Sequence, residues 1–167
     1  MRYDIFPARP GDVAKLPALE CRCARLFPPG HIPEHLLDET VSSEAFETAR
    51  LENRLWIAAV NDEAVGFALF ATMDGLAILA ELDVLPEYGR KGIGGALLAR
   101  VIEHAREAGF AELYLTTFSD IPWNAPFYAK RGFIVADEDT LPAPLRDILA
   151  EERGRGLPNR IAMQFHL

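Results

Sequence analysis

Leu76-Ala-Ile-Leu-Ala-Glu-Leu-Asp-Val-Leu-Pro86 is an apolar run that leads into a basic, glycine-rich turn, Glu87-Tyr-Gly-Arg-Lys-Gly-Ile-Gly-Gly95. The run is typical of a buried strand, and the residues after the turn have the spacing of a helix. The helix is predicted because its apolar residues fall on one face, at Ile93, Leu97, Leu98, Val101, Ile102, Ala105 and Ala108. Gly109 stands where a left-handed C-terminal cap is expected.

The glycines of the turn predict an anion-binding site. Without side chains, Gly92, Gly94 and Gly95 let a phosphate approach the backbone closely. The unpaired N–H groups of the first helical turn and the positive end of the helix dipole face the same place. Arg90 and Lys91 add two positive charges there.

Two well-known phosphate loops do not fit this turn. The loop of phosphate-binding NTPases requires Gly, four residues and then Gly-Lys-Ser or Gly-Lys-Thr, and no stretch of the chain has it. The dinucleotide fingerprint fails because Leu97 takes the position of its third glycine, and residues 87–89 intervene after the strand. A helix start whose glycines serve packing alone is the remaining alternative.

The stretch resembles the GNAT superfamily of acetyl-CoA-dependent N-acetyltransferases. The signature of that family is a strand ending near Val-x-Pro, then Arg or Gln, two residues, Gly, one residue, Gly or Ala, and a helix. Val84-Leu-Pro86 and Gly92-Ile-Gly94 match it. Gly89 stands at the first signature position in place of Arg or Gln, and the basic residue has moved one place on, to Arg90.

The resemblance implies that acetyl-CoA is the co-substrate and that backbone N–H groups hold its pyrophosphate. On this basis the residues expected to contact acetyl-CoA are Leu82, Asp83, Val84, Gly89, Arg90, Lys91, Gly92, Ile93, Gly94, Gly95, Asn124 and Phe127.

Composition and length favour one globular domain spanning residues 1–167, half of whose residues are hydrophobic. The net charge of −8 argues against nucleic acid as a partner and is compatible with a cationic amine. No apolar run is long enough to span a membrane, and the N-terminal residues lack the apolar core of a signal peptide, which favours the cytoplasm. Cys21 and Cys23 are expected to be free thiols, and no metal site is predicted.

The order of predicted elements indicates a mixed α/β domain, with a central twisted sheet and helices on both faces. It is also the order of the GNAT fold. The expected strands are residues 2–8, 55–60, 65–72, 76–84, 112–118, 133–137 and 160–166. The expected helical regions are residues 13–26, 34–52 with a weak point near 41–43, 93–108 and 123–131.

A second motif, Tyr128-Ala-Lys-Arg-Gly-Phe133, follows a short predicted helix. The resemblance implies that Tyr128 gives a proton to the departing coenzyme A thiolate, as a phenol that is protonated at neutral pH is able to do. The alternative is a tyrosine that only packs under the sheet. Asn124 has two alternatives as well, a hydrogen bond to the pantetheine arm or a cap on the helix.

Direct transfer requires a base for the amine and a donor for the developing oxyanion. The resemblance assigns the donor to the backbone of Val84. Glu81 is the candidate base, because it is ionisable in an otherwise apolar strand, and Asp83 is its rival on the same face unless a bulge intervenes. The alternative is that both carboxylates simply face solvent. His104 is expected on the exposed side of the central helix.

Two other segments need an interpretation. His31-Ile-Pro-Glu-His35 has the letters of a zinc-protease motif, but Pro33 makes one helix through it improbable, so a loop that borders the acceptor is expected. Residues 138–159 form a long connection in which Leu145, Ile148 and Leu149 make one helical face. This connection is expected to cap the acceptor site or to join a homodimer.

The sequence therefore predicts an enzyme that moves an acetyl group from acetyl-CoA to the primary amine of a small molecule or a protein. A non-catalytic acyl-CoA-binding module of the same fold is the alternative, and a nucleotide-dependent oxidoreductase is a more distant one.

Overall fold

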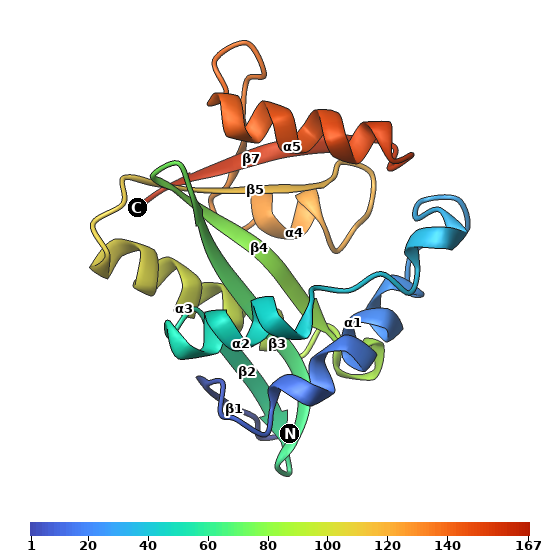
Figure 1. The fold of residues 1–167 in the computed structure, drawn as a ribbon, viewed down its shortest axis with the longest axis vertical. Coiled ribbons are helices and arrows are strands. Elements are labelled where there is room, and N and C mark those ends of the chain that lie inside the picture. Colours follow the sequence, from blue (N-terminus) through green and yellow to red (C-terminus); the bar gives the residue numbers. More distant parts are fainter.

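The computed structural model describes all 167 residues as one mixed sheet with helices on both faces (Figure 1). The strand order is β1-β2-β3-β4-β5-β7-β6. The strands are β1 (Asp4–Pro7), β2 (Leu55–Val60), β3 (Glu63–Met73), β4 (Leu76–Val84), β5 (Glu112–Phe118), β6 (Ile134–Val135) and β7 (Arg160–His166). The helices are α1 (Leu16–Ala24), α2 (Ser43–Leu51), α3 (Ile93–Glu107), α4 (Ala125–Ala129) and α5 (Ala143–Gly154).

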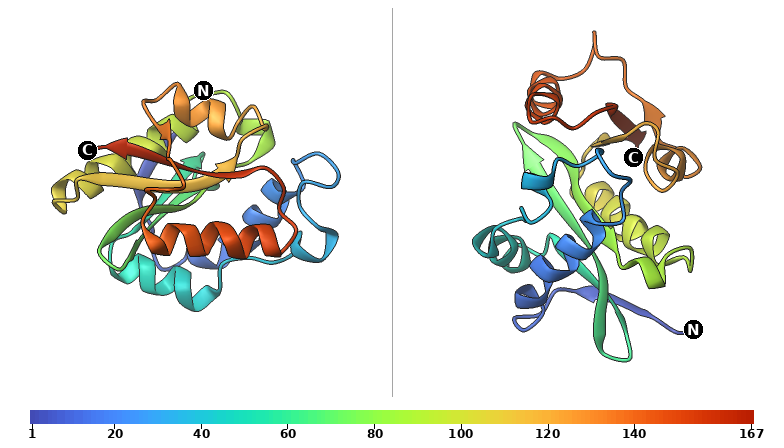
Figure 2. Two further views of the ribbon diagram at one scale, coloured as in Figure 1. Left: turned by 90° about the horizontal axis from the view of Figure 1, so that it is seen from above. Right: turned by 90° about the vertical axis from the view of Figure 1, so that its right-hand side faces the viewer.

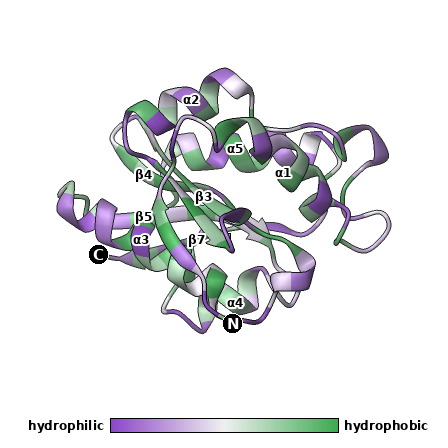
Figure 3. Cartoon of the chain, turned by 90° about the horizontal axis from the view of Figure 1, so that it is seen from below, coloured by the Kyte–Doolittle hydropathy of each residue, from purple (hydrophilic) through white to green (hydrophobic).

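Helices cover the sheet in two layers. In Figure 2, α3 and α4 lie on one face of the sheet, and α1, α2 and α5 lie on the other. Figure 3 shows that the hydrophobic residues of β3 and β4 lie between these layers. None of the helices combines the length and the apolarity that crossing a bilayer requires. The mixed sheet with helices on both faces confirms the predicted fold class.

The sheet opens at its centre, between β4 and β5. These two strands are the only parallel neighbours, and they pair only at Ala77 with Leu113 and at Ile78 with Tyr114. Beyond these pairs the strands diverge (Figure 1). Residues 80–84 of β4 consequently have a partner strand on the β3 side alone.

A bulge interrupts β4 just where the strands diverge. Leu69 of β3 pairs with Glu81, whereas the next residue, Phe70, pairs with Leu79, so Ala80 is an extra residue in β4. Side chains directly opposite each other on antiparallel strands share a face. The bulge therefore reverses the face on which the residues after it lie.

The packing of β3 shows which face each side chain occupies. Phe70 stacks on His104 of α3, with ring centroids 4.8 Å apart, and Phe67 stacks on Phe46 of α2 at 5.4 Å. Asp83 pairs with Phe67 and so lies on the face of α1 and α2, as does Glu81. Without the bulge both carboxylates would lie under α3.

Several predicted boundaries were wrong. The second helical region is split into a short 3₁₀ turn at Glu34–Leu36 and α2, because Ser42 caps α2 by accepting a hydrogen bond from the N–H of Ala45 at 3.1 Å. Helix α4 and strand β6 are shorter than predicted. Strand β7 and Gly109, whose φ is +83°, lie as predicted.

The prediction for His104 was wrong too. Its ring lies half-buried between the edges of Trp56, 5.1 Å away, and Phe70. Burial lowers the pKa of this histidine. The alternation of apolar residues on α3 did not reveal the contact, because the aromatic partners come from β2 and β3.

The connection before β7 forms α5, which has a small core of its own. This helix packs its apolar side on β5 and β7, and the buried residues beneath it are Ile78, Tyr114, Ala136, Leu141, Leu145, Leu149 and Ala162. Cys21 and Cys23 are free, as expected.

Truncation of the small core should destabilise the protein. Leu145 is 0% exposed, so Leu145→Ala should lower the free energy of unfolding by about 2–4 kcal/mol. Chemical denaturation measures this change. Asp147→Ala, on the exposed side of the same helix, should change it by less than about 0.5 kcal/mol. Equal effects of the two substitutions would contradict the packing of α5.

Candidate functional site

The turn between β4 and α3 presents open backbone N–H groups. Gly92 adopts a left-handed φ of +85° before the helix, and Arg90 has φ of +57°. The first N–H with an intrahelical partner is that of Ala96, which donates to the carbonyl of Gly92 at 3.0 Å. The N–H groups of residues 90–95 are unpaired at the positive end of the helix dipole, which suits a phosphate.

One basic residue at this helix start was missed by the sequence analysis. The guanidinium of Arg131 lies 3.7 Å from the ring centroid of Phe127 and donates to the carbonyl of Phe127 at 3.0 Å. A Cβ at Gly95 would lie 3.1 Å from this guanidinium, so Gly95 leaves the room that it occupies. The spacing of four residues from Phe127 was the available signal.

The two basic residues of the turn behave differently. Lys91 Nζ donates to the backbone carbonyl of Glu87 at 2.8 Å. Glu87 is also paired with Arg22 of α1, at 2.7 Å. Arg90 has no partner in the protein and is exposed. Arg90 and Arg131 are therefore the cations most available to an anion at this turn.

The N–H of Val84 points into the opening between β4 and β5. Antiparallel strands direct the N–H groups of alternate residues toward the same neighbour. The N–H of Leu85 donates to the carbonyl of Val65 on β3, at 2.8 Å. The N–H groups of Leu82 and Val84 consequently point away from β3. They face the gap that forms where β5 diverges from β4.

Three carboxyl groups lie on the α1 face of this opening. Glu81, Asp83 and Glu20 of α1 are all half-buried. Burial, followed by the charges of Asp83 and Glu20, raises the pKa of Glu81 well above its ordinary value. Burial, and then the charge of Glu20, raises the pKa of Asp83 to about 7. The alternative that Glu81 and Asp83 simply face solvent was therefore wrong.

Glu20 is held by the chain before α2. Its carboxylate accepts a hydrogen bond from the N–H of Val41, at 3.0 Å to one oxygen and 3.3 Å to the other. Burial raises the pKa of Glu20 to about 7, although the bond from Val41 opposes the shift. Glu20 could not be predicted as a site residue from the sequence, because only the tertiary fold brings α1 against β4.

Tyr128 reaches the opening from the other face of the sheet. Its side chain is 8% exposed and packs edge-on against Phe127 and Phe133, with centroids 5.1 and 5.6 Å away. Its hydroxyl has no hydrogen bond to the protein. Every fully buried side-chain oxygen in the protein has a partner, so this hydroxyl is in contact with solvent. Burial, and then the charges of Asp83 and Glu81, raises the pKa of Tyr128, so the phenol is protonated at neutral pH.

Asn124 does not cap α4 with its side chain. Its Oδ1 accepts a hydrogen bond from the N–H of Phe118 at 3.4 Å, and no bond joins it to the first turn of α4. The capping alternative was therefore wrong. The contact with pantetheine stays a prediction.

Residues 27–35 lie beside the end of β5. The ring of Phe27 packs on Phe118 and Trp123, with centroids 5.2 and 5.7 Å away. His31 Nε2 lies 2.9 Å from a carboxylate oxygen of Asp120. The five residues of the zinc-like pattern do not share a helix, because a 3₁₀ turn begins only at Glu34, after Pro33.

Residues 155–160 also lie beside the end of β5 and contact the connection between α1 and α2. Arg155 pairs with Glu39 in the connection between α1 and α2, and the amide of Asn159 donates to Asp120 at 3.1 Å. Arg160, 13% exposed, binds both oxygens of Glu152 at 2.9 and 3.1 Å. The charge of Arg160, which lowers the pKa of Glu81, is thus already paired with Glu152.

Comparisons with known proteins agree with this arrangement. Residues 20–133 match the model of the acetyltransferase (GNAT) family. Streptothricin acetyltransferase A of Bacillus subtilis is 42% identical over 69 residues, which are 41% of this chain and 39% of that protein. The chain thus spans about two-fifths of the length of this relative.

Two solved structures share the fold. The PaiA N-acetyltransferase of Thermoplasma acidophilum, in complex with coenzyme A, has a TM-score of 0.77 and 20% identity over the full length of both chains. N-acetylglutamate synthase of Neisseria gonorrhoeae, in complex with coenzyme A and N-acetyl-glutamate, has a TM-score of 0.77 and 25% identity. The match covers all of this chain and 35% of the synthase chain.

The buried carboxyl of Glu20 should make the protein less stable as the pH rises. Its pKa is about 7 in the folded state against an ordinary value of 4.5, so the folded protein binds the proton more tightly than the unfolded chain. The free energy of unfolding therefore falls between these two pH values. Glu20→Gln should be more stable than the wild type by roughly 1–3 kcal/mol at pH 8 and by much less at pH 5.

Denaturant titrations at the two pH values measure this difference. Glu63→Gln, on the exposed start of β3, is the matched control and should show no such gain. A gain from Glu20→Gln that is independent of pH would contradict the raised pKa.

Proposed function

Because the chain belongs to the acetyltransferase (GNAT) family, we propose that it transfers the acetyl group of acetyl-CoA to a primary amine by direct attack. The observation that carries the proposal is the unpaired start of α3 beside the opening between β4 and β5. An anion site and an open strand edge lie there side by side, as an elongated ligand with a phosphate in its middle requires.

In this proposal the pyrophosphate of acetyl-CoA lies against the N–H groups of residues 90–95, with Arg90 and Arg131 as the cations. The N–H of Gly89 is not among them, because it donates to the carbonyl of Pro86 at 3.1 Å. The pantetheine arm runs along the free edge of β4 at Leu82 and Val84, whose N–H groups point into the opening. Gly94 and Phe127 border this path, because a Cβ at Gly94 would lie 3.4 Å from the ring of Phe127.

The chemistry follows from the groups around the opening. Glu81 or Asp83 takes a proton from the ammonium of the acceptor, and the neutral amine attacks the thioester carbonyl. The N–H of Val84 stabilises the oxyanion. The C–S bond then breaks, the N–C bond remains, and the hydroxyl of Tyr128 gives its proton to the thiolate of coenzyme A. The nitrogen loses its second proton to solvent, and the phenolate of Tyr128 takes one up from solvent, so the neutral amide and the phenol are restored.

The non-catalytic module is not favoured, because the family match and the named acetyltransferases that the chain resembles support turnover. No observation favours an oxidoreductase. The cytoplasmic location, the homodimer and the capping role of residues 138–159 remain predictions.

Substitution of Gly92 should weaken acetyl-CoA binding. An alanine there is strained at φ +85° and disturbs the N–H groups that face the pyrophosphate, so Gly92→Ala should raise the Kd for acetyl-CoA by about tenfold or more. Isothermal titration calorimetry measures it. Gly109→Ala is strained in the same way, at φ +83°, but lies at the other end of α3 and should leave the Kd within about twofold. Equal losses would point to general destabilisation.

Tyr128→Phe should reduce kcat and leave acetyl-CoA binding intact. Loss of the proton donor should lower kcat by about 10- to 1,000-fold, because the thiolate then leaves without assistance. Turnover is measured by release of the coenzyme A thiol with a panel of primary amines, and binding by calorimetry. Tyr114→Phe is a control, since its hydroxyl donates to Glu112 under α5. An unchanged kcat for Tyr128→Phe would remove its proposed role.

A further inference from the structure

Glu20 is aimed at the proposed acceptor site rather than at solvent. It lies on the same face of α1 as Leu16, Leu19 and Cys23, which are buried against the sheet. Helix α1 packs on β4, on the face that the bulge gives to Glu81 and Asp83. The hydrogen bond from Val41 holds the carboxylate of Glu20 in this position.

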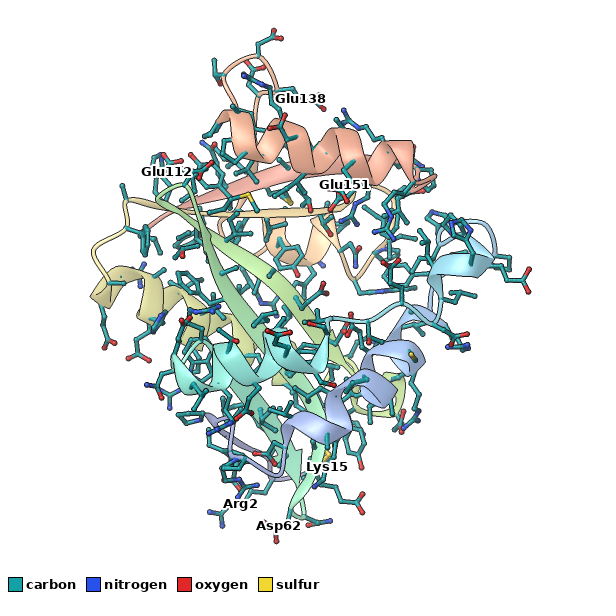
Figure 4. All side chains as sticks on the ribbon, viewed as in Figure 1. Arg2, Lys15, Asp62, Glu112, Glu138 and Glu151 are labelled. Atoms are coloured by element: carbon teal, nitrogen blue, oxygen red, sulfur yellow. The ribbon has the colours of Figure 1, made fainter.

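The three carboxyl groups have no cation to balance them. None of the ion pairs of the protein contains Glu20, Glu81 or Asp83. Arg160, whose charge acts on Glu81, is held by both oxygens of Glu152. By contrast, charged side chains such as the labelled Lys15 and Glu138 lie on the outside (Figure 4).

A second observation indicates that a ligand belongs here. The hydroxyl of Tyr128, from a side chain more than nine-tenths buried, is without a protein partner. It lies near enough for the charges of Asp83 and Glu81 to raise its pKa. A donor from a side chain that is mostly buried and half-buried carboxyl groups that do not bond to one another suit a polar molecule that bonds to both.

One carboxylate more is present than one amine needs. Glu81 and Asp83 are close in sequence to Val84, at the thioester, and either is sufficient to take the proton. Glu20 comes from another helix and is left to contact a different part of the acceptor. A carboxylate on the acceptor would be repelled by this site, because no free arginine or lysine lies among the three groups.

We propose that the acceptor is a small diamine without a carboxylate, and that Glu20 binds its second ammonium group while the first reacts beside Glu81 and Asp83. Glu20 is then a specificity-determining residue. The inference rests on the proposed function and adds the class of acceptor. The connection that carries Phe27 and His31 is tied to β5 and to Asp120, which favours a small molecule over a protein chain.

Three amines of one chain length test the proposal. They are 1,4-diaminobutane, butylamine and 4-aminobutanoate, which carry at the far end a positive charge, no charge and a negative charge. With acetyl-CoA, kcat/KM should be about 10- to 100-fold higher for the diamine than for butylamine, and lowest for 4-aminobutanoate. Diamines of three to six carbons then define the best spacing.

The variant Glu20→Gln tests the assigned residue. The ratio of kcat/KM for the diamine to that for butylamine should fall about tenfold or more, mainly through a higher KM for the diamine. Glu103→Gln, an equal change of charge on the outer side of α3, should leave the ratio unchanged.

Each other outcome overturns the inference. Equal use of 4-aminobutanoate and the diamine, an unchanged ratio in Glu20→Gln, or acetyl-CoA binding with no acetylation of any diamine rejects the diamine site but not acetyl transfer. Absence of acetyl-CoA binding rejects the proposed function and this inference together.

Discussion

The opening at the centre of the sheet depends on a single constraint, the short pairing of β4 with β5. A strand in the middle of a sheet normally has its backbone groups paired on both sides, and unpaired buried groups are unfavourable. Here β4 keeps only two residue pairs with β5 and then runs on beside β3 alone. Its free edge lies beside the start of α3, where four further backbone N–H groups lack partners. One long polar ligand would satisfy both sets of unpaired groups, which is the physical reason for proposing the cofactor site here.

The side of the sheet on which chemistry can occur is set by the extra residue in β4. Because Ala80 reverses the alternation, the two carboxyl groups lie on the side of α1, and Val84 lies on the side of α3, near Gly94 and Phe127. Tyr128 approaches the same opening from the face of α4. The proposed reaction thus needs groups from both faces, and only a gap between strands brings such groups together.

Much of the fold and part of the candidate site could be predicted from the sequence, because the residue patterns that indicate them lie within single segments of the chain. The glycine turn, the helix after it and β7 follow from spacing and from the chemistry of glycine. The face on which Glu81 and Asp83 lie could not be predicted. A bulge depends on how two strands pair, and the sequence around Ala80 has no feature that indicates one. Arg131, Glu20 and the partners of His104 were missed for a related reason: each acquires its neighbours from elements distant in the chain.

The three carboxyl groups do not behave as three independent acids. Burial raises the pKa of Glu20 and of Asp83 to about 7, and burial, followed by the charges of these two groups, raises the pKa of Glu81. Groups coupled in this way have pKa values that belong to the set rather than to single residues. Near pH 7 the three groups together are therefore partly protonated. The three carboxyl groups are therefore able together to take up one proton and to return another, and a proton that arrives there belongs to the cluster rather than to any one residue.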